Sequence, residues 1–250
     1  MKRLIMIILL LFAIDALLSR AGELKANIPD YLKEPYQRNV VLQAYYQGEI
    51  NYYTTGIIWD NDHILSVEHL LSAIPANADK KDVKITVLFV GLQNYKDLRE
   101  IEVEIVKKTH PNSFNDFIFL KIKNKPKFLA EKNFAAPKLA LLEEVFLTEK
   151  VVVIGNPCIG APFLNTVICA EIAKILDSEE EMFASCGVKG MKEIILSYPT
   201  APGFSGSGVW NERGELVGLV NLAIKLPDYN QLFLGGAMPA DTIKKFVYSK

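Results

Sequence analysis

The feature that most constrains the fold is a recurrence of short segments rich in β-branched and aromatic residues. They form two sets of six, separated by a stretch richer in lysine, proline and glutamate at residues 123–150. The segments are residues 40–46, 52–59, 64–67, 83–90, 101–106 and 116–122, then 151–155, 166–172, 193–198, 208–210, 216–224 and 231–237. Short, closely spaced strands are typical of all-β barrels. We predict two six-stranded antiparallel barrels packed face to face, with a single short helix at residues 241–248.

The length and composition fit this division of the chain. Its 250 residues are 50% hydrophobic and 23% charged, which is enough to bury one large core or two small ones. We expect an N-terminal barrel at residues 22–135 and a C-terminal barrel at residues 136–250.

The first 21 residues differ from the rest. A short basic start precedes an unbroken apolar run at residues 4–14, and Ser19 and Ala21 provide the small residues that signal peptidase prefers before its cleavage site. The run is shorter than the roughly 20 residues that span a bilayer. We predict a signal peptide at residues 1–21 and export to the periplasm or the medium, with an uncleaved membrane anchor as the alternative.

The charge and the cysteines exclude several classes of function. A formal net charge of −1, without a basic patch, gives no footprint for nucleic acid. The cysteines Cys158, Cys169 and Cys186 form no Cys-x-x-Cys or His/Cys cluster, so we expect no metal and no cofactor. Cys158 and Cys169 could pair across a hairpin, or the cysteines could be small buried side chains.

A glycine-rich hexapeptide at residues 203–208 suits a nucleophilic serine. Gly203 allows its own N–H to point at a developing oxyanion, and the N–H of Ser205 supplies a second donor. Gly206 has no Cβ to crowd an incoming carbonyl. Such strings also occur as ordinary loops, so the interpretation depends on the partners of Ser205.

A serine hydroxyl needs an imidazole base, and that base needs a carboxylate to orient it. His69 follows an apolar strand, whereas His63 and His110 lie beside turn residues. Asp116 leads directly into a strongly apolar strand, an unusual place for an acid without a partner. We predict His69 as the base and Asp116 as its carboxylate.

The order His69, Asp116, Ser205 resembles that of chymotrypsin-like serine peptidases. The flanking motifs at residues 55–59, 64–69, 151–157, 214–219 and 236–239 resemble those of bacterial HtrA/Deg-type proteases. The resemblance covers nearly all of residues 39–248. It implies a chymotrypsin-like pair of barrels and a cleft between them that holds the triad. As a departure from that family, we expect no PDZ domain after the peptidase domain, because the sequence ends at Lys250.

The resemblance also implies roles for particular residues. Gly203 and Ser205 would form the oxyanion hole with their N–H groups. Asn221 would support the triad carboxylate, and Asn221, Leu222 and Ala223 would pair with the backbone of a protein or peptide substrate. Phe204 replaces the aspartate that digestive members pair with a new N-terminus, and Glu68 stands beside the histidine where the family has a small residue.

Two functions from different classes follow. The first is a serine endopeptidase that forms an acyl-enzyme; the alternative is a silent or conditionally active trypsin-like domain that binds proteins, as a chaperone does. A distorted oxyanion loop around Phe204 would favour the alternative. The expected pocket walls at residues 199–202, 220–223 and around Gly235 contain no acid and no histidine, which favours an apolar or small side chain at the cleaved residue. The sequence does not indicate an oligomeric state.

Overall fold

The computed structural model describes residues 28–93, 98–110, 115–157, 164–176, 192–225 and 233–249. Its first six strands are β1 (Asn39–Tyr46), β2 (Glu49–Ile58), β3 (His63–Ser66), β4 (Val83–Leu88), β5 (Ile101–Lys108) and β6 (Ile118–Ile122). The second six are β7 (Lys150–Gly155), β8 (Thr166–Leu176), β9 (Glu193–Pro199), β10 (Gly208–Asn211), β11 (Leu216–Lys225) and β12 (Phe233–Pro239).

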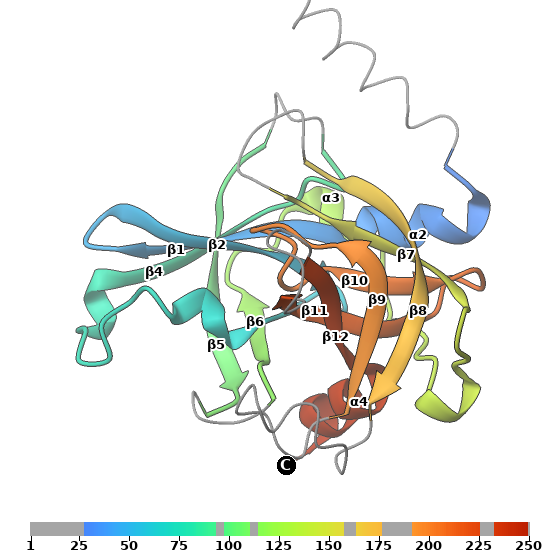
Figure 1. Ribbon diagram of the computed structural model, residues 1–250. Helices are drawn as coiled ribbons and strands as arrows, with labels where there is room; N and C mark the ends of the chain where they lie inside the picture. Colours follow the sequence, from blue (N-terminus) through green and yellow to red (C-terminus); the bar gives the residue numbers. More distant parts are fainter. Residues whose placement is uncertain are drawn as a thin grey trace, which may run out of the picture.

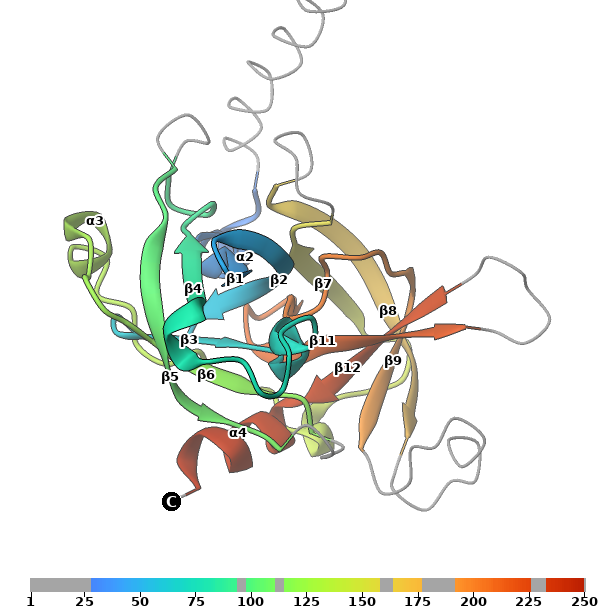
Figure 2. The ribbon, with the colours of Figure 1, turned by 90° about the vertical axis from the view of Figure 1, so that its left-hand side faces the viewer.

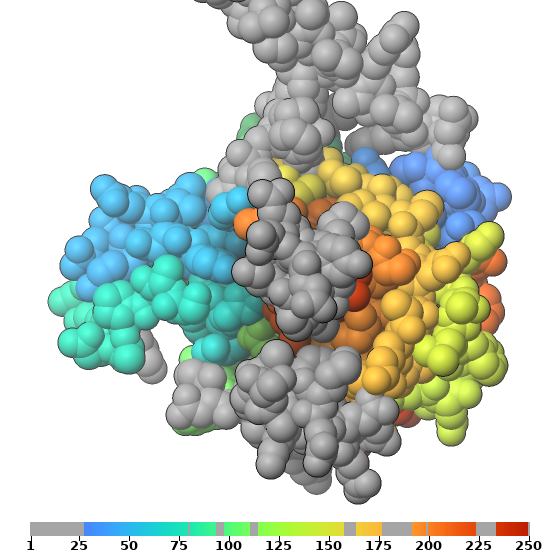
Figure 3. All heavy atoms as spheres, in the orientation of Figure 1, coloured from blue at the N-terminus to red at the C-terminus, as the bar shows by residue number. Residues whose placement is uncertain are grey.

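Each set of six strands closes into an antiparallel barrel. The strand order is β1-β2-β3-β6-β5-β4 in barrel 1 and β10-β11-β12-β9-β8-β7 in barrel 2. Figure 2 shows the two barrels side by side, and Figure 3 shows their residues on opposite sides of one face of the molecule. The predicted fold is confirmed.

The side chains form three apolar cores. One fills barrel 1, including Leu42 and Leu120, and a second fills barrel 2, including Val153 and Val217. The third joins the barrels, because residues of both pack with the C-terminal helix α4 (Ala240–Tyr248). Figure 1 shows this helix below the barrels. The helix therefore fastens the two barrels together, which fixes the relative positions of residues contributed by each.

The prediction of a single helix was wrong. Helix α2 (Asp30–Arg38) precedes β1, and the short helix α3 (Lys127–Ala130) follows β6 in the chain. Sequence patterns gave no sign of α2, which contains Pro35 and few apolar residues. Tertiary contacts hold it instead: the buried Arg38 guanidinium donates to the carbonyls of Ile58 at 2.8 Å and Ala135 at 2.7 Å.

An ion-pair cluster closes the turn between β10 and β11. The carboxylate of Glu215, 5% exposed, accepts hydrogen bonds from Asn211 and Arg213 and forms a further ion pair with Lys138. Burial alone would raise the pKa of Glu215, but these partners outweigh it and lower the pKa to about 2. The cluster therefore stabilises the end of barrel 2 through a charged carboxylate.

Candidate active site

The loop that carries Ser205 begins with a tight turn. The N–H of Phe204 donates to the carbonyl of Ala201 at 3.1 Å, and Gly203, at the third position of the turn, has φ +96°. Pro202 at the second position and a glycine with positive φ at the third are typical of a type II turn. The glycine is required here because its backbone conformation is one that other residues rarely adopt.

Two N–H groups of this loop have no acceptor within the described part of the chain. The N–H groups of Phe204, Gly206 and Ser207 donate to carbonyl oxygens, that of Gly206 to Val220 at 2.6 Å. No such bond involves the N–H of Gly203 or of Ser205. The loop thus offers two uncommitted donors, with Phe204 between them, at the positions predicted for an oxyanion hole.

Phe204 anchors the loop in the core of barrel 2. Its side chain is 2% exposed and meets the ring of Tyr198 edge to face, with 5.8 Å between ring centroids. Phe204 therefore holds the loop by apolar packing, at the position where digestive chymotrypsin-like peptidases have an aspartate that pairs with a new N-terminus.

Thr55 on β2 fastens the serine loop to barrel 1. Its N–H donates to the carbonyl of Ser205 at 2.8 Å, and its hydroxyl donates to the carbonyl of Gly203 at 2.7 Å. The same hydroxyl accepts from the N–H of Asn156, at the end of β7, at 2.9 Å. Through these bonds, the buried Thr55 fixes the position of the serine loop relative to β2 and to the end of β7.

Gly206 makes this approach possible. It has φ +84°, and a Cβ at this position would overlap the carbonyl oxygen of Thr55 and lie 2.5 Å from Oγ of Ser66. The sequence suggested that Gly206 leaves room for a substrate; the structure shows that it leaves room for strand β2. Ser66 ends β3, so the serine loop lies against the strand that leads to His69.

His69 and Asp116 are brought together from separate segments. His69 lies in the 3-10 helix η2 (Glu68–Leu71), and Asp116 lies two residues before β6 rather than in a strand as predicted. The Asp116 carboxylate accepts from the backbone N–H of His69 at 2.9 Å and contacts Nδ1 of its ring. This double contact fixes the ring orientation and leaves Nε2 as the nitrogen available to a substrate or to Ser205. Among the described residues, no hydrogen bond involves the Ser205 hydroxyl.

Glu68 and His63, which lie near His69 in the sequence, have partners elsewhere. Glu68 lies in the helical turn η2 and forms an ion pair with Lys108 at 2.7 Å. His63 binds Asp60 and stacks on Phe119, with 4.9 Å between ring centroids. Neither side chain is therefore placed to assist His69.

The predicted substrate strand lies on β11. Asn221 sits at an irregularity in the pairing of β11 with β12; it is buried, and its Oδ1 has no hydrogen-bond partner. Leu222 is half-buried and Ala223 is exposed. Within the described residues no hydrogen bond joins Asn221 to Asp116, so the supporting role expected of Asn221 stays a prediction.

One acidic residue near the site was missed. Glu193, at the start of β9, is 2% exposed, and neither of its carboxyl oxygens has a hydrogen-bond partner. Burial raises its pKa well above the usual range, the charge of Asp116 raises it further, and Asn221 lowers it in part. The sequence signal was present: like Asp116, Glu193 is an acid that leads into an apolar strand.

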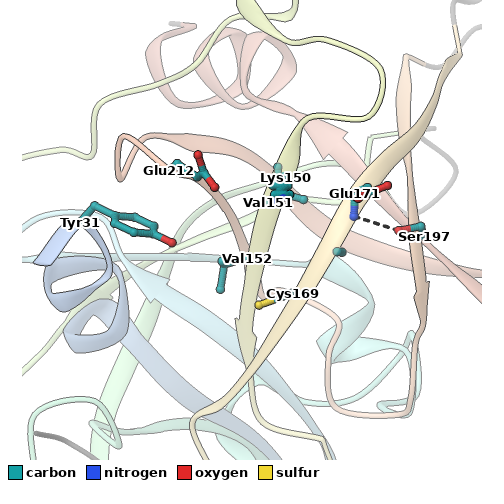
Figure 4. A pocket seen from close by; sticks show the side chains of 9 residues that line it. Tyr31, Lys150, Val151, Val152, Cys169, Glu171, Ser197 and Glu212 are labelled. Carbon is teal, nitrogen blue, oxygen red and sulfur yellow. Dashed lines mark hydrogen bonds between the residues drawn. The ribbon is translucent and has the colours of Figure 1, made fainter. Parts of the chain in front are cut away.

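Other binding features lie away from these residues or are not found. A pocket on the outer side of barrel 2 is lined by nine residues, none from the predicted triad: Tyr31, Lys150, Val151, Val152, Cys169, Ala170, Glu171, Ser197 and Glu212 (Figure 4). Cys169 is a free, exposed thiol, whereas Cys158 and Cys186 lie outside the described residues. Over the described ranges, no group of three or more His, Cys, Asp or Glu is placed to hold a metal. No helix in those ranges has the length and apolarity needed to cross a membrane.

Comparison with known proteins gives consistent results. The model of the trypsin-like peptidase domain matches residues 54–219. A serine protease HtrA-like protein of Staphylococcus haemolyticus is 30% identical over 122 residues, which are 47% of this chain and 18% of that protein. The chain thus spans less than a fifth of that relative.

Solved structures share the fold at low sequence identity. The crystal structure of Deg5 superposes with a TM-score of 0.61 at 16% identity, over 86% of this chain and 90% of that one. An inactive serine-to-alanine mutant of Rv3671c from M. tuberculosis superposes with a TM-score of 0.60 at 15% identity, over 87% and 88% of the two chains.

Proposed function

Because the chain belongs to the family of trypsin-like peptidase domains, we propose that it is a serine endopeptidase that acts through Ser205, His69 and Asp116. The observation that carries the proposal is the pair of uncommitted N–H groups on Gly203 and Ser205. A loop that served only as a scaffold would have no physical need to leave two backbone donors unpaired.

The first chemical step assigns one task to each residue. The Ser205 hydroxyl attacks the substrate carbonyl while Nε2 of His69 accepts its proton. Asp116 keeps the proton on Nδ1 and stabilises the imidazolium that forms. The N–H groups of Gly203 and Ser205 donate to the oxyanion of the tetrahedral intermediate.

In the steps that follow, His69 acts first as an acid and then again as a base. His69 returns its proton to the leaving amine, and the carbon–nitrogen bond breaks to leave an ester on Ser205. Water then attacks this acyl-enzyme, again giving its proton to His69, and the acid product leaves as Ser205 recovers its hydrogen. Main-chain pairing along Asn221, Leu222 and Ala223 would hold the substrate as an added strand.

The proposed setting is outside the cytoplasm, since residues 1–21 have the pattern of a signal peptide. Fractionation of cells that express the full chain, beside a variant without residues 1–21, tests this. Export of the full chain and retention of the shortened one are expected; equal distribution of the two would contradict it.

The activity is tested by incubating the full chain with a fluorescently labelled unfolded protein such as casein. Release of peptides by the wild type, and none by Ser205→Ala, is the expected result. A wild type that binds the labelled protein without cleaving it would instead support the binding-module alternative.

A further inference from the structure

Glu193 is a buried acid for which the proposed chemistry has no role. Its side chain is 2% exposed, and both carboxyl oxygens lack a hydrogen-bond partner. It lies on the face of barrel 2 next to Gly236, where an added Cβ would come 2.8 Å from Oε1 of Glu193. Burying an unpaired carboxylate is costly, so its retention requires an explanation.

The face of barrel 2 that carries Glu193 also carries Met238, whose sulfur contacts the backbone N–H of Asp116. The N–H of Asp116 points at Sδ of Met238 at 3.3 Å, and Met238 follows Gly236 by two residues on β12. Because alternate residues of a strand share a face, Glu193, Gly236 and Met238 lie on one side. The pairing of Ile194 with Ala237 sets Glu193 close to Met238. Glu193 therefore lies next to Met238, the residue that contacts the backbone N–H of Asp116.

Asn221 on β11 is a second buried polar residue close to Glu193. It is 8% exposed, its Oδ1 has no partner, and its amide lies close enough to Glu193 to lower the pKa of that group in part. That lowering is the effect of an N–H donor on the carboxylate, so a bond from Glu193 to Oδ1 requires the amide to be turned over. An ionised Glu193 would be repelled by the negative charge of Asp116, which raises the pKa of Glu193. A protonated Glu193 removes that repulsion and supplies the one O–H donor that the unpaired Asn221 oxygen lacks.

We propose that Glu193 is a positioning residue: its protonated carboxyl donates to Oδ1 of Asn221 and turns the amide N–H₂ group toward Asp116. The array would then run from Glu193 through Asn221 and Asp116 to His69. This role rests on the proposed peptidase function, because it orients the carboxylate that orients the base.

The groups facing Glu193 limit what can titrate there. Asp116 supplies the negative charge that acts on it, and Asn221 the polar contact; Leu176, which pairs with it on β8, and Gly236 and Met238 beside it on β12 carry no charge. Lys192 precedes it and is exposed. A pH effect that Glu193→Gln removes can therefore be assigned to Glu193.

The kinetic test compares kcat and KM across pH for the wild type, Glu193→Gln and Glu193→Leu. Glutamine keeps the shape and a donor for Asn221, so it should match the wild type at neutral pH and lose the wild type's alkaline decline. Leucine removes the donor, and we expect kcat to fall about tenfold with KM unchanged. Glu171→Gln, at an exposed site on β8, should change neither profile.

The folding test does not depend on activity. The folding equilibrium constant of the wild type should fall relative to Glu193→Gln by about tenfold per pH unit above pH 4.5, until Glu193 ionises. In a double-mutant cycle, Glu193→Leu and Asn221→Ala should be coupled by about fivefold in that constant.

The outcomes separate the two proposals. Absent activity of a folded wild type would refute the peptidase function, and the cycle would still decide whether Glu193 bonds Asn221. Additive single effects in the cycle, or pH profiles of wild type and Glu193→Gln that coincide, would overturn the positioning role.

Discussion

Replacing Gly206 by alanine tests whether strand β2 sets the position of the serine loop. The substitution adds two costs. Holding an alanine at φ +84° costs about 1–2 kcal/mol. The added Cβ would also lie 2.9 Å from the carbonyl carbon of Thr55 and 2.5 Å from Oγ of Ser66, so the loop must withdraw from β2.

Withdrawal breaks the two hydrogen bonds from Thr55 to the carbonyls of Ser205 and Gly203. At about 1 kcal/mol each, their loss adds about 2 kcal/mol, so Gly206→Ala should destabilise the protein by about 3–4 kcal/mol. The displaced loop should also misplace the two oxyanion donors, and peptidase activity should fall at least 100-fold in the fraction that stays folded.

Gly48→Ala is the matched control. Gly48 has φ +87°, but a Cβ there would meet nothing within 4 Å. Chemical denaturation should show a loss of only 1–2 kcal/mol for this variant, with unchanged peptidase activity per folded molecule. Equal losses of stability for the two alanine variants, or full activity of Gly206→Ala, would refute the claim that contact with β2 positions the loop.

Three further predictions concern single side chains. Thr55→Val should lower kcat about tenfold by releasing the carbonyl of Gly203, and Thr55→Ser should restore it; equal activity of both variants would show that the hydroxyl does not position the loop. Asp116→Asn should lower kcat/KM about 10⁴-fold, since an amide cannot hold the His69 proton on Nδ1, and a loss below tenfold in steady-state assays would argue against this orientation. Glu215→Gln should cost about 2–3 kcal/mol of stability at pH 7, because a carboxyl group with a depressed pKa stabilises the fold above pH 4.5. The denaturation curves of the variant and the wild type should converge as the pH falls toward 2. A stability difference that is independent of pH would contradict the ion-pair explanation.

The sequence was sufficient for the barrels because each strand carries its own signal. Residues 151–154, for example, are four apolar residues, all β-branched, a run that is typical of a buried strand. Helix α2 carries no such signal, since its stability comes from Arg38 reaching carbonyls of β2 and of a segment about 100 residues away. Contacts of this range leave no periodic pattern in the sequence.

The residues of the candidate site also differ in whether the sequence alone reveals their role. Asp116 was found because an acid before an apolar strand is anomalous by itself, and the structure brings it to His69. Glu193 shows the same anomaly but matches no expected motif. Thr55 was missed because its importance lies in reaching Gly203, 148 residues later in the chain, and a threonine in a strand is ordinary.

The central claim, that Ser205 is an activated nucleophile, is tested most directly by a fluorophosphonate probe. The full chain, Ser205→Ala and His69→Ala are incubated with the probe, and the modified residue is located by peptide mass spectrometry. Stoichiometric modification of Ser205 in the wild type, and none in either variant, is the predicted result. A folded wild type that remains unmodified, or modification that persists in His69→Ala at the wild-type rate, would contradict the account.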